Sequence, residues 1–281
     1  TGIYPLSASV VLPRSLGICG RVIHSTAIID SKAEVPVSVS VGPFVVIDAG
    51  VKIGEGCSIG PFVHLTGDTT LGKRNIIHGG AIIGDAPQDL NYKGEPTRLC
   101  IGDDNIFREH VTLHRSNSLE EDTIIGSHNF FMADSHVGHN AVVGDHTILA
   151  NGALVGGHAV IGDQVFLSSN CGIHQFVRIG TLAMMQGNSG VSQDVPPFTM
   201  VVFGMNMMCG LNTVGLRRAG FTSEQRSELK ACYKRVFMEG GNIGQVVKQA
   251  LEESPGEKAR EMLEFIAAST RGVCSHATRK R

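Results

Sequence analysis

The feature that most constrains the fold is a hydrophobic residue at every sixth position over most of the chain. The series begins at Ile23 and ends at Val191, and its only polar members are Asp89 and Glu95. Because hydrophobic residues make up only 42% of the chain, chance does not produce such a run. A period of six matches neither the 3.6-residue period of a helix nor the two-residue period of a single strand.

This spacing is typical of a parallel β-helix built from hexapeptide repeats. In such a fold each hexad forms one short strand and one turn, and three hexads form a triangular coil of about 18 residues. Hexapeptide-repeat proteins wind left-handed, and it is this resemblance that implies the handedness. We therefore expect a mainly β protein in which residues 22–197 form a left-handed parallel β-helix with the sixth residues pointing inward.

Glycine is abundant, with 35 residues, and it often directly follows the inward position. We interpret these glycines as corner residues, because tight corners need a backbone that reaches conformations other residues avoid. They are Gly42, Gly54, Gly60, Gly72, Gly84, Gly102, Gly126, Gly138, Gly144, Gly156, Gly162 and Gly180.

Two polar segments, residues 85–100 and 114–123, interrupt the pattern. The six-residue phase resumes after each, and Leu119 still falls on it. We expect each segment to replace whole hexads and to loop out of one corner of the coil. Loops on a rigid scaffold often carry function.

The remainder, residues 198–281, has helical signals and predicts a small α-helical domain. Thr222 and Gln225 have the spacing of a capping box at a helix start. Residues 243–253 predict a short set of amphipathic turns, and residues 254–255 predict the start of another helix.

Composition excludes several other classes. A net charge of −2 provides no basic field for nucleic acid. The sequence contains no apolar run of about 18 residues, so we expect no integral membrane segment. The seven cysteines form no CxxC pair and suit a reducing compartment better than a disulfide framework.

Residues 1–21 lie outside the repeat and contain Arg14, Arg21 and several serines. The first acidic residue of the chain is Asp30. This composition resembles the end of an organellar transit segment and predicts a mitochondrial location. The alternatives are a surface strand or a disordered leader on a cytoplasmic protein.

Four of the 12 histidines fall on one edge of the predicted coil, because residues 18 apart stack on adjacent coils. They are His136, His139, His158 and His174, and none occupies an inward position. One interpretation is general-base catalysis by one imidazole. A second is a zinc site, and a third is a set of polar residues at a subunit interface.

Several motifs surround these histidines and resemble those of the acyl-carrier-protein–UDP-N-acetylglucosamine O-acyltransferases of lipid A biosynthesis. The resemblance covers about residues 22–273. The motifs are DSHVGH at 134–139, IHQF at 173–176, SGVSQDVPP at 189–197, GLRRAGF at 215–221, QDLNYKGEPTR at 88–98 and STRG at 269–272.

The resemblance implies that a 3-hydroxyacyl chain moves from acyl carrier protein to the 3-hydroxyl of UDP-N-acetylglucosamine. It implies His139 as the general base and the backbone N–H of Gly157 as the oxyanion donor. It also implies a homotrimer with its sites between subunits, and no metal or organic cofactor.

The same resemblance implies further binding residues. Sugar and substrate contacts would come from Asp89, His136, His158, His174 and Gln175. Asn212 and Arg218 would lie near the nucleotide, Met184 would line the acyl groove and Gly187 would end it.

Three positions depart from the family pattern. Asn140 stands where an Asp commonly follows the base, and Asn91 and Ala219 replace basic residues. The alternatives are another hexapeptide acyltransferase such as an N-acyltransferase of the same pathway, a zinc carbonic anhydrase of this fold, or a catalytically weak scaffold that binds acyl carrier protein.

Overall fold

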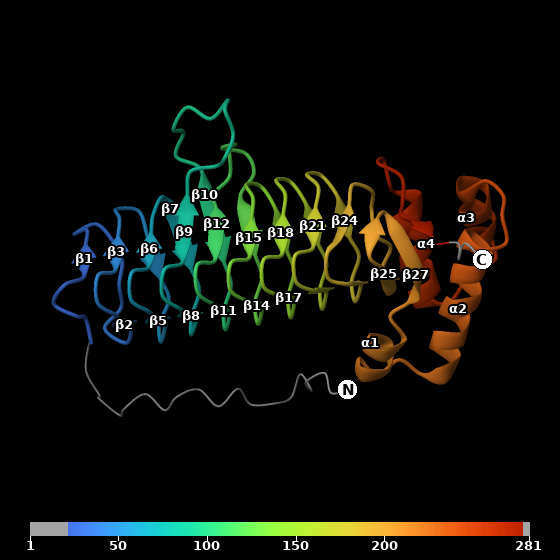
Figure 1. The fold of residues 1–281 in the computed structure, drawn as a ribbon, viewed down its shortest axis with the longest axis horizontal. Helices are drawn as coiled ribbons and strands as arrows, with labels where there is room; N and C mark the ends of the chain where they lie inside the picture. Colours follow the sequence, from blue (N-terminus) through green and yellow to red (C-terminus); the bar gives the residue numbers. More distant parts are fainter. Residues whose placement is uncertain (1–21, 278–281) are drawn as a thin grey trace.

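The computed structural model describes residues 22–277, in which a long three-sided prism is followed by a group of helices (Figure 1). Successive short strands pass to three faces in turn, so each face is a sheet of strands from successive coils. We name them face A, with 11 strands, face B, with 10, and face C, with seven. The corners are named by the faces they join, in chain order: AB, BC and CA.

Face A contains β2 (Ser40–Val41), β5 (Ser58–Ile59), β8 (Ile76–Ile77), β11 (Ile106–Phe107), β14 (Phe130–Phe131), β17 (Ile148–Leu149), β20 (Phe166–Leu167), β23 (Met184–Met185), β25 (Thr199–Val201), β27 (Met207–Leu211) and β28 (Ser275–His276). Face B contains β1 (Ile28–Ile29), β3 (Val46–Ile47), β6 (His64–Leu65), β9 (Ile82–Asp85), β12 (Thr112–His114), β15 (His136–Val137), β18 (Leu154–Val155), β21 (Gly172–Ile173), β24 (Ser189–Val191) and β26 (Gly204–Met205). Face C contains β4 (Lys52–Ile53), β7 (Asp68–Leu71), β10 (Arg98–Ile101), β13 (Thr123–Ile125), β16 (Val142–Val143), β19 (Val160–Ile161) and β22 (Arg178–Ile179).

The sixth residues form the core, as the sequence predicts. Val137 pairs with Val155 in the parallel register of β15 and β18, and both side chains are fully buried. Phe107 and Phe131 stack inside the prism with ring centroids 5.0 Å apart. Leu119 is an exception, because it sits on the second insertion and 54% of its surface is exposed. Its agreement with the six-residue phase is therefore coincidental, and its assignment as an inward residue is wrong.

The interpretation of the glycines as residues of unusual backbone conformation is also wrong for nearly all of the set. Of the glycines named above, only Gly84 has a left-handed φ, of +87°. Most of the others are needed because the next coil passes very close: a Cβ on Gly54 would lie 2.5 Å from the backbone of Gly72. The left-handed corner positions hold mainly other residues, such as Phe44, Asn140 and His158.

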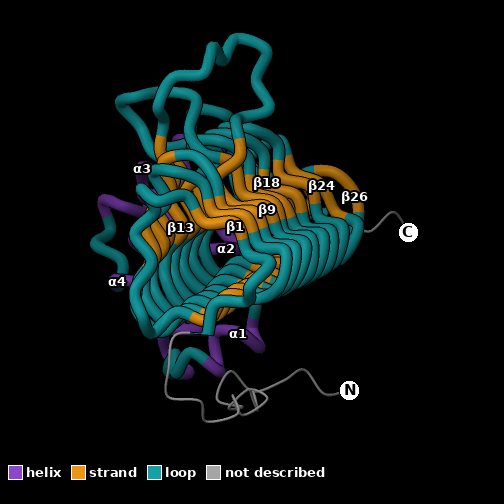
Figure 2. Tube along the Cα trace, turned by 90° about the vertical axis from the view of Figure 1, so that its left-hand side faces the viewer, coloured by secondary structure: helices purple, strands orange, loops and turns teal. Residues whose placement is uncertain are grey.

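Both insertions leave the prism at the BC corner, on consecutive coils (Figure 2). The first joins β9 to β10 and the second joins β12 to β13. Since β9, β12 and β15 are neighbours on face B, the next coil along that corner is the one that carries His139. The retained six-residue phase thus places both loops beside the candidate base.

Four helices follow the prism: α1 (Thr213–Arg218), α2 (Ser223–Phe237), α3 (Ile243–Glu252) and α4 (Glu257–Ala267). The predicted capping box of Thr222 and Gln225 is present at the start of α2. Residues 243–252 form a full helix rather than loose turns, and α4 begins after an N-cap at Gly256, slightly later than expected.

The helices are fastened to the last coils by the buried carboxylate of Asp194. It accepts hydrogen bonds from Arg178 on face C and from the hydroxyl of Ser269 beyond α4. Arg178 also donates to the carbonyl of Phe265 in α4, at 3.0 Å. Among residues 22–277, the helices are too short or too polar to traverse a lipid bilayer.

Candidate active site

His139 lies at the BC corner, where the polypeptide turns from β15 to β16. Its Nδ1 is 2.9 Å from Oδ1 of Asn140, which follows it in the chain. Its other ring nitrogen, Nε2, faces the next coil, where a Cβ added to Gly157 would lie only 2.8 Å away. The 18-residue arithmetic therefore places the candidate base and Gly157 side by side.

Gly157 offers an unoccupied donor at this point. Its carbonyl accepts a hydrogen bond from the N–H of Phe176, at 3.0 Å. Its own N–H takes part in none of the hydrogen bonds found within residues 22–277. A free backbone N–H next to a basic nitrogen is the arrangement that can stabilise a developing oxyanion.

His158 packs against both neighbours along the same corner. Its ring meets that of His139 edge to face at 5.1 Å and stacks on Phe176 at 4.6 Å. Its Nδ1 lies 3.7 Å from the carboxylate of Glu121 in the second insertion. Burial, followed by the nearby His139, lowers the pKa of His158. It is thus mainly neutral at neutral pH, with one ring nitrogen that donates and one that accepts a hydrogen bond.

Asp89 reaches this site from the first insertion. Its carboxylate accepts hydrogen bonds from the backbone N–H of Asn91 and from Nδ2 of Asn117, at 2.9 and 2.7 Å. These bonds, led by that from Asn91, lower its pKa, and the proximity of His139 adds to the effect. Asp89 is therefore ionised at neutral pH, close to the candidate base His139.

The first insertion is held in place by Arg115. Its Nη1 donates to the carbonyl of Gly84 at 2.8 Å, and its Nε lies 3.2 Å from the hydroxyl of Tyr92. Tyr92 in turn donates to the carbonyl of Glu95 within the loop. These contacts fix the loop that carries Asp89 against the prism wall.

His136 and His174 flank this centre. The Nδ1 of His136 is 2.8 Å from the hydroxyl of Thr112, and its ring meets that of His114 edge to face at 5.1 Å. His174 is exposed and its Nδ1 lies 3.5 Å from the guanidinium of Arg271. Gln175, also exposed, follows it and lies one coil beyond Gly157.

Comparison with protein families identifies two matching models. Residues 194–274 match the family described as "Udp N-acetylglucosamine O-acyltransferase; Domain 2". Segments 38–67, 50–85 and 122–157 match the bacterial transferase hexapeptide repeat.

Relatives align over nearly the whole chain. The acyl-[acyl-carrier-protein]–UDP-N-acetylglucosamine O-acyltransferase of Chlorobaculum parvum is 53% identical over 255 residues, covering 89% of this chain and 96% of that protein. The enzyme of Thermodesulfovibrio yellowstonii is 42% identical over 254 residues, covering 90% and 98%. The chain belongs to the UDP-N-acetylglucosamine O-acyltransferase family.

Solved structures of UDP-N-acetylglucosamine acyltransferases have the same fold. That of Francisella novicida superposes with a TM-score of 0.86 at 35% identity, covering 92% of this chain and 95% of the other. That of Arabidopsis superposes with a TM-score of 0.79 at 32% identity, covering 90% and 100%. The mainly β, left-handed β-helical fold expected from the repeat and from the resemblance to hexapeptide-repeat proteins is therefore confirmed.

Four of the residues that the family resemblance implies lie elsewhere in this acyltransferase. Asn212 caps α1 and donates to the carbonyl of Leu182 at the CA corner, and Arg218 is at the end of the same helix. Met184 is on face A, and Gly187 is at the AB corner beside the backbone of Ser169. Figure 1 shows α1 on the side of the prism opposite the insertion loops. Within one chain, these residues and His139 do not form a common site.

Three residues of the second insertion contact the site and were not predicted. Ser116, Asn117 and Glu121 surround the side chain of Asn140. The only available signal was the retained six-residue phase, which shows that the loop returns to the corner where it left. That signal does not say which loop side chains turn back toward the prism.

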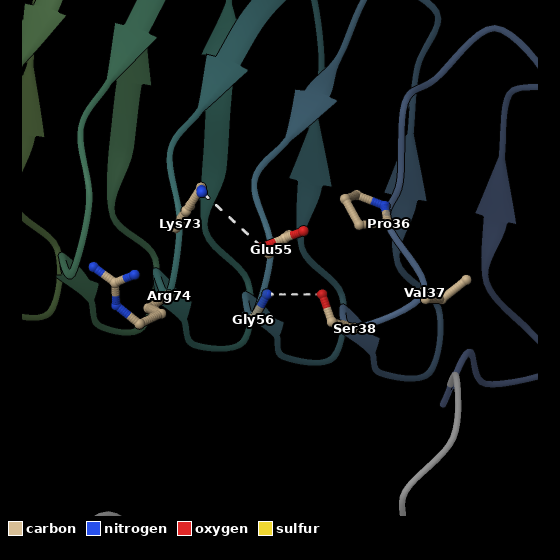
Figure 3. A pocket seen from close by; sticks show the side chains of 7 residues that line it. All are labelled: Pro36, Val37, Ser38, Glu55, Gly56, Lys73 and Arg74. Atoms are coloured by element: carbon tan, nitrogen blue, oxygen red, sulfur yellow. Dashed lines mark hydrogen bonds and ion pairs between the residues drawn. The ribbon is translucent and has the colours of Figure 1, made fainter.

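A hollow elsewhere on the surface contains none of the histidines of the candidate site. It has a volume of about 480 Å³ and lies near the start of the prism, where Lys73 pairs with Glu55 and Gly56 donates to Ser38 (Figure 3). It is at the CA corner, many coils from His139. Among residues 22–277, no group of three or more His, Cys, Asp or Glu side chains is arranged to hold a metal ion, so this geometry does not favour the zinc interpretation.

We expect the free energy of unfolding to decrease as the pH is lowered from about 6.5 to about 4, because His136 stays unprotonated in the folded chain over this range. Burial, followed by the neighbouring His114 and His139, lowers the pKa of His136 to about 4. An unfolded histidine takes up a proton near pH 6.5, so below that pH the unfolded chain binds more protons than the folded one. The free energy of unfolding therefore decreases from about pH 6.5 to about pH 4, by on the order of 2 kcal/mol for this half-buried group.

Urea unfolding of the parent and of His136→Gln at about pH 7.5 and about pH 5 measures this effect. The variant should lose less stability than the parent between the two conditions. His24→Gln, at an exposed position on the first coil of the prism, is the control and should follow the parent. Equal losses for His136→Gln and the parent would contradict the assignment.

Proposed function

We propose that this chain catalyses the first acylation of lipid A biosynthesis, with a 3-hydroxyacyl chain passing from acyl carrier protein to the 3-hydroxyl of UDP-N-acetylglucosamine. Family membership supports the substrates. The arrangement of His139 between Asn140 and Gly157 supports the mechanism and is the observation that carries the proposal.

His139 acts as the general base. A sugar hydroxyl is a weak nucleophile until a base removes its proton, and a neutral imidazole suits this task near pH 7. Hydrogen bonding of Nδ1 to Asn140 leaves Nε2 to take the proton. Nε2 faces Gly157 rather than the prism interior, so an incoming hydroxyl can approach it.

The N–H of Gly157 stabilises the oxyanion. When the sugar oxygen bonds to the thioester carbon, the carbonyl oxygen gains a negative charge that a preorganised N–H can accept as a hydrogen bond. Collapse of this tetrahedral intermediate breaks the C–S bond. The imidazolium of His139 then returns its proton to the departing thiolate of the carrier, which leaves the base neutral.

Other side chains bind the substrates. Ionised Asp89 can accept hydrogen bonds from sugar hydroxyls. His158, His174 and Gln175 extend this polar surface along the corner, and His136 extends it onto face B. Arg218 can pair with the diphosphate of the nucleotide, with Asn212 beside it. Met184 lines the acyl groove and Gly187, which has no side chain, ends it.

The active unit is a homotrimer with sites between subunits. His139 lies at the BC corner, whereas Asn212 contacts the CA corner and Arg218 ends the helix that Asn212 caps, and this separation supports the assembly. A threefold ring presents one corner of each subunit to a different corner of the next. The CA corner of one copy can then bring its Arg218 to the His139 of its neighbour.

Mixing two inactive variants tests this arrangement. His139→Ala and Arg218→Ala are each expected to be nearly inactive, and subunits exchanged by co-refolding should regain about a quarter of parental activity, because that share of interfaces joins two intact halves. Sedimentation should report a trimer. A monomer, or a mixture that stays inactive although its subunits have exchanged, would contradict the model.

The reaction itself is tested by turnover of UDP-N-acetylglucosamine with 3-hydroxyacyl carrier proteins of several chain lengths. We expect one preferred length and an ester at the sugar 3-hydroxyl. Binding of the nucleotide sugar without turnover at any length would instead favour a scaffold. Transfer to an amino sugar would favour the N-acyltransferase alternative.

We also propose a mitochondrial location, because residues 1–21 contain arginine and serine without acidic residues. This segment lies outside the described residues. Fractionation of cells that express the tagged full-length protein tests the proposal, and recovery in the cytosolic fraction alone would contradict it.

A further inference from the structure

The side chain of Asn140 is buried and uses all of its hydrogen-bonding capacity. It is 5% exposed. Its Oδ1 accepts from the backbone N–H of Asn117 at 3.0 Å and lies 2.9 Å from Nδ1 of His139. Its Nδ2 donates to the hydroxyl of Ser116 at 2.8 Å and to the carboxylate of Glu121 at 3.4 Å. An amide has two donors and two acceptor sites, so none is left over.

The neighbours of this amide determine which way it points. The backbone N–H of Asn117 can only donate, so the atom facing it must be the amide oxygen. A carboxylate such as that of Glu121 can only accept, so the atom facing it must be the amide nitrogen. The two constraints agree, and a flipped amide would place like groups against each other on both sides.

The orientation of the amide in turn fixes the tautomer of His139. The oxygen of Asn140 can only accept, so Nδ1 of His139 must carry the ring proton. The lone pair is then on Nε2, the nitrogen that faces Gly157. A histidine whose second nitrogen is held by a fixed acceptor is locked in one tautomer and one ring orientation.

We propose that residues 115–122 of the second insertion select the tautomer of His139, with Ser116, the N–H of Asn117 and Glu121 as positioning groups that act through Asn140. This proposal rests on the proposed role of His139 as the base. It also explains why the second insertion buries the hydroxyl of Ser116 against Asn140. The Ser116 hydroxyl is fully buried, and its own proton goes to the carbonyl of Ser118 at 2.9 Å. It is therefore an acceptor toward Asn140.

The same contacts explain why position 140 holds an amide rather than a carboxylate. In an aspartate at this position, one carboxylate oxygen would replace the amide nitrogen. That oxygen would face the Ser116 hydroxyl, which already donates its proton to the carbonyl of Ser118, and the Glu121 carboxylate, 3.4 Å away. Two carboxylates at this distance repel each other. Asn140 and Glu121 thus form a matched pair, in which the loop rather than the prism carries the negative charge, 3.7 Å from His158.

Nitrogen-15 NMR of the ring-labelled protein tests the tautomer without any turnover. At about pH 8, His139 should show a protonated, pyrrole-type Nδ1 and an unprotonated, pyridine-type Nε2, with the signals assigned by their loss in His139→Gln. Asn140→Gly should remove this preference for the Nδ1–H tautomer, and glycine tolerates the left-handed φ of +57° at position 140. Asn140→Asp, which still offers an acceptor, should keep it.

Asn170→Gly is the matched control, because Asn170 has the same φ at the AB corner. It should leave the His139 signals unchanged. A parent protein with the proton on Nε2, or an Asn140→Gly variant that keeps the Nδ1–H form, would overturn the proposal. A correct tautomer with no acyl transfer would instead leave this inference intact and reject the proposed function.

The matched pair is tested separately by a double-mutant cycle on kcat/KM. Asn140→Asp alone is expected to lower activity about tenfold, and adding Glu121→Gln should recover most of the loss because it removes the repulsion. The acid limb of the pH profile of kcat/KM should shift to higher pH in the double variant than in the parent, since a carboxylate beside Nδ1 stabilises the imidazolium of His139. Additive effects of the two substitutions would contradict the pairing.

Discussion

His139→Ala is expected to lower kcat by about 10²–10⁴-fold, because it removes the group that we propose takes the proton from the sugar hydroxyl. The KM for UDP-N-acetylglucosamine should change much less, since Asp89 and His158 remain. His139→Gln should be similarly impaired, because an amide fills the space but is not basic. Steady-state kinetics with 3-hydroxyacyl carrier protein measure both parameters.

The control for this substitution is His24→Ala, at an exposed position on the first coil of the prism, far from His139. It should keep parental activity. Thermal unfolding should show that His139→Ala remains folded, because the ring lies outside the hydrophobic core. Acyl transfer by His139→Ala at the parental rate would remove His139 from the mechanism.

Gly157→Ala is expected to abolish most activity while leaving the fold intact. The added methyl carbon would lie 2.8 Å from Nε2 of His139, closer than a carbon can approach without displacement of the ring. It therefore occupies the space that the sugar hydroxyl would take in the proposed mechanism, beside the proposed oxyanion donor. We expect a loss in kcat on the order of 10²-fold, comparable to the removal of an oxyanion donor.

The backbone at Gly157 does not require glycine, because its φ is outside the left-handed region. Loss of activity would thus reflect the site rather than strain. Gly244→Ala, in the first turn of α3, is the control and should retain activity with equal or greater stability. An active Gly157→Ala enzyme would show that the hydroxyl approaches His139 from another side.

The repeat predicts most of the prism because its physical origin is local. Each inward residue stacks on an equivalent residue one coil away, so one period specifies register, faces and core together, as the pairing of Val137 with Val155 shows. The role of glycine is different. Neighbouring coils approach so closely that a Cβ on Gly54 has no room, and this crowding depends on spacing between coils that no local pattern contains.

The same arithmetic locates part of the site. Residues 18 apart stack, which is why spacing along the chain is enough to pair His139 with Gly157. The arithmetic fails across the insertions, because Thr112 pairs with His136, 24 positions later, instead of 18. Contacts from Asn117 and Glu121 to Asn140 cross that break and could not be counted along the chain.

The six-residue period alone specifies the coil, the corner that carries His139, His158 and His174, and the pairing of His139 with Gly157, because stacking repeats one short period. The folded chain is needed to show which loop atoms face the Asn140 amide, and hence which ring nitrogen of His139 lacks a proton. Hydrogen-bond polarity depends on atoms brought together from different coils, and no spacing in the chain specifies the direction in which a donor or an acceptor points.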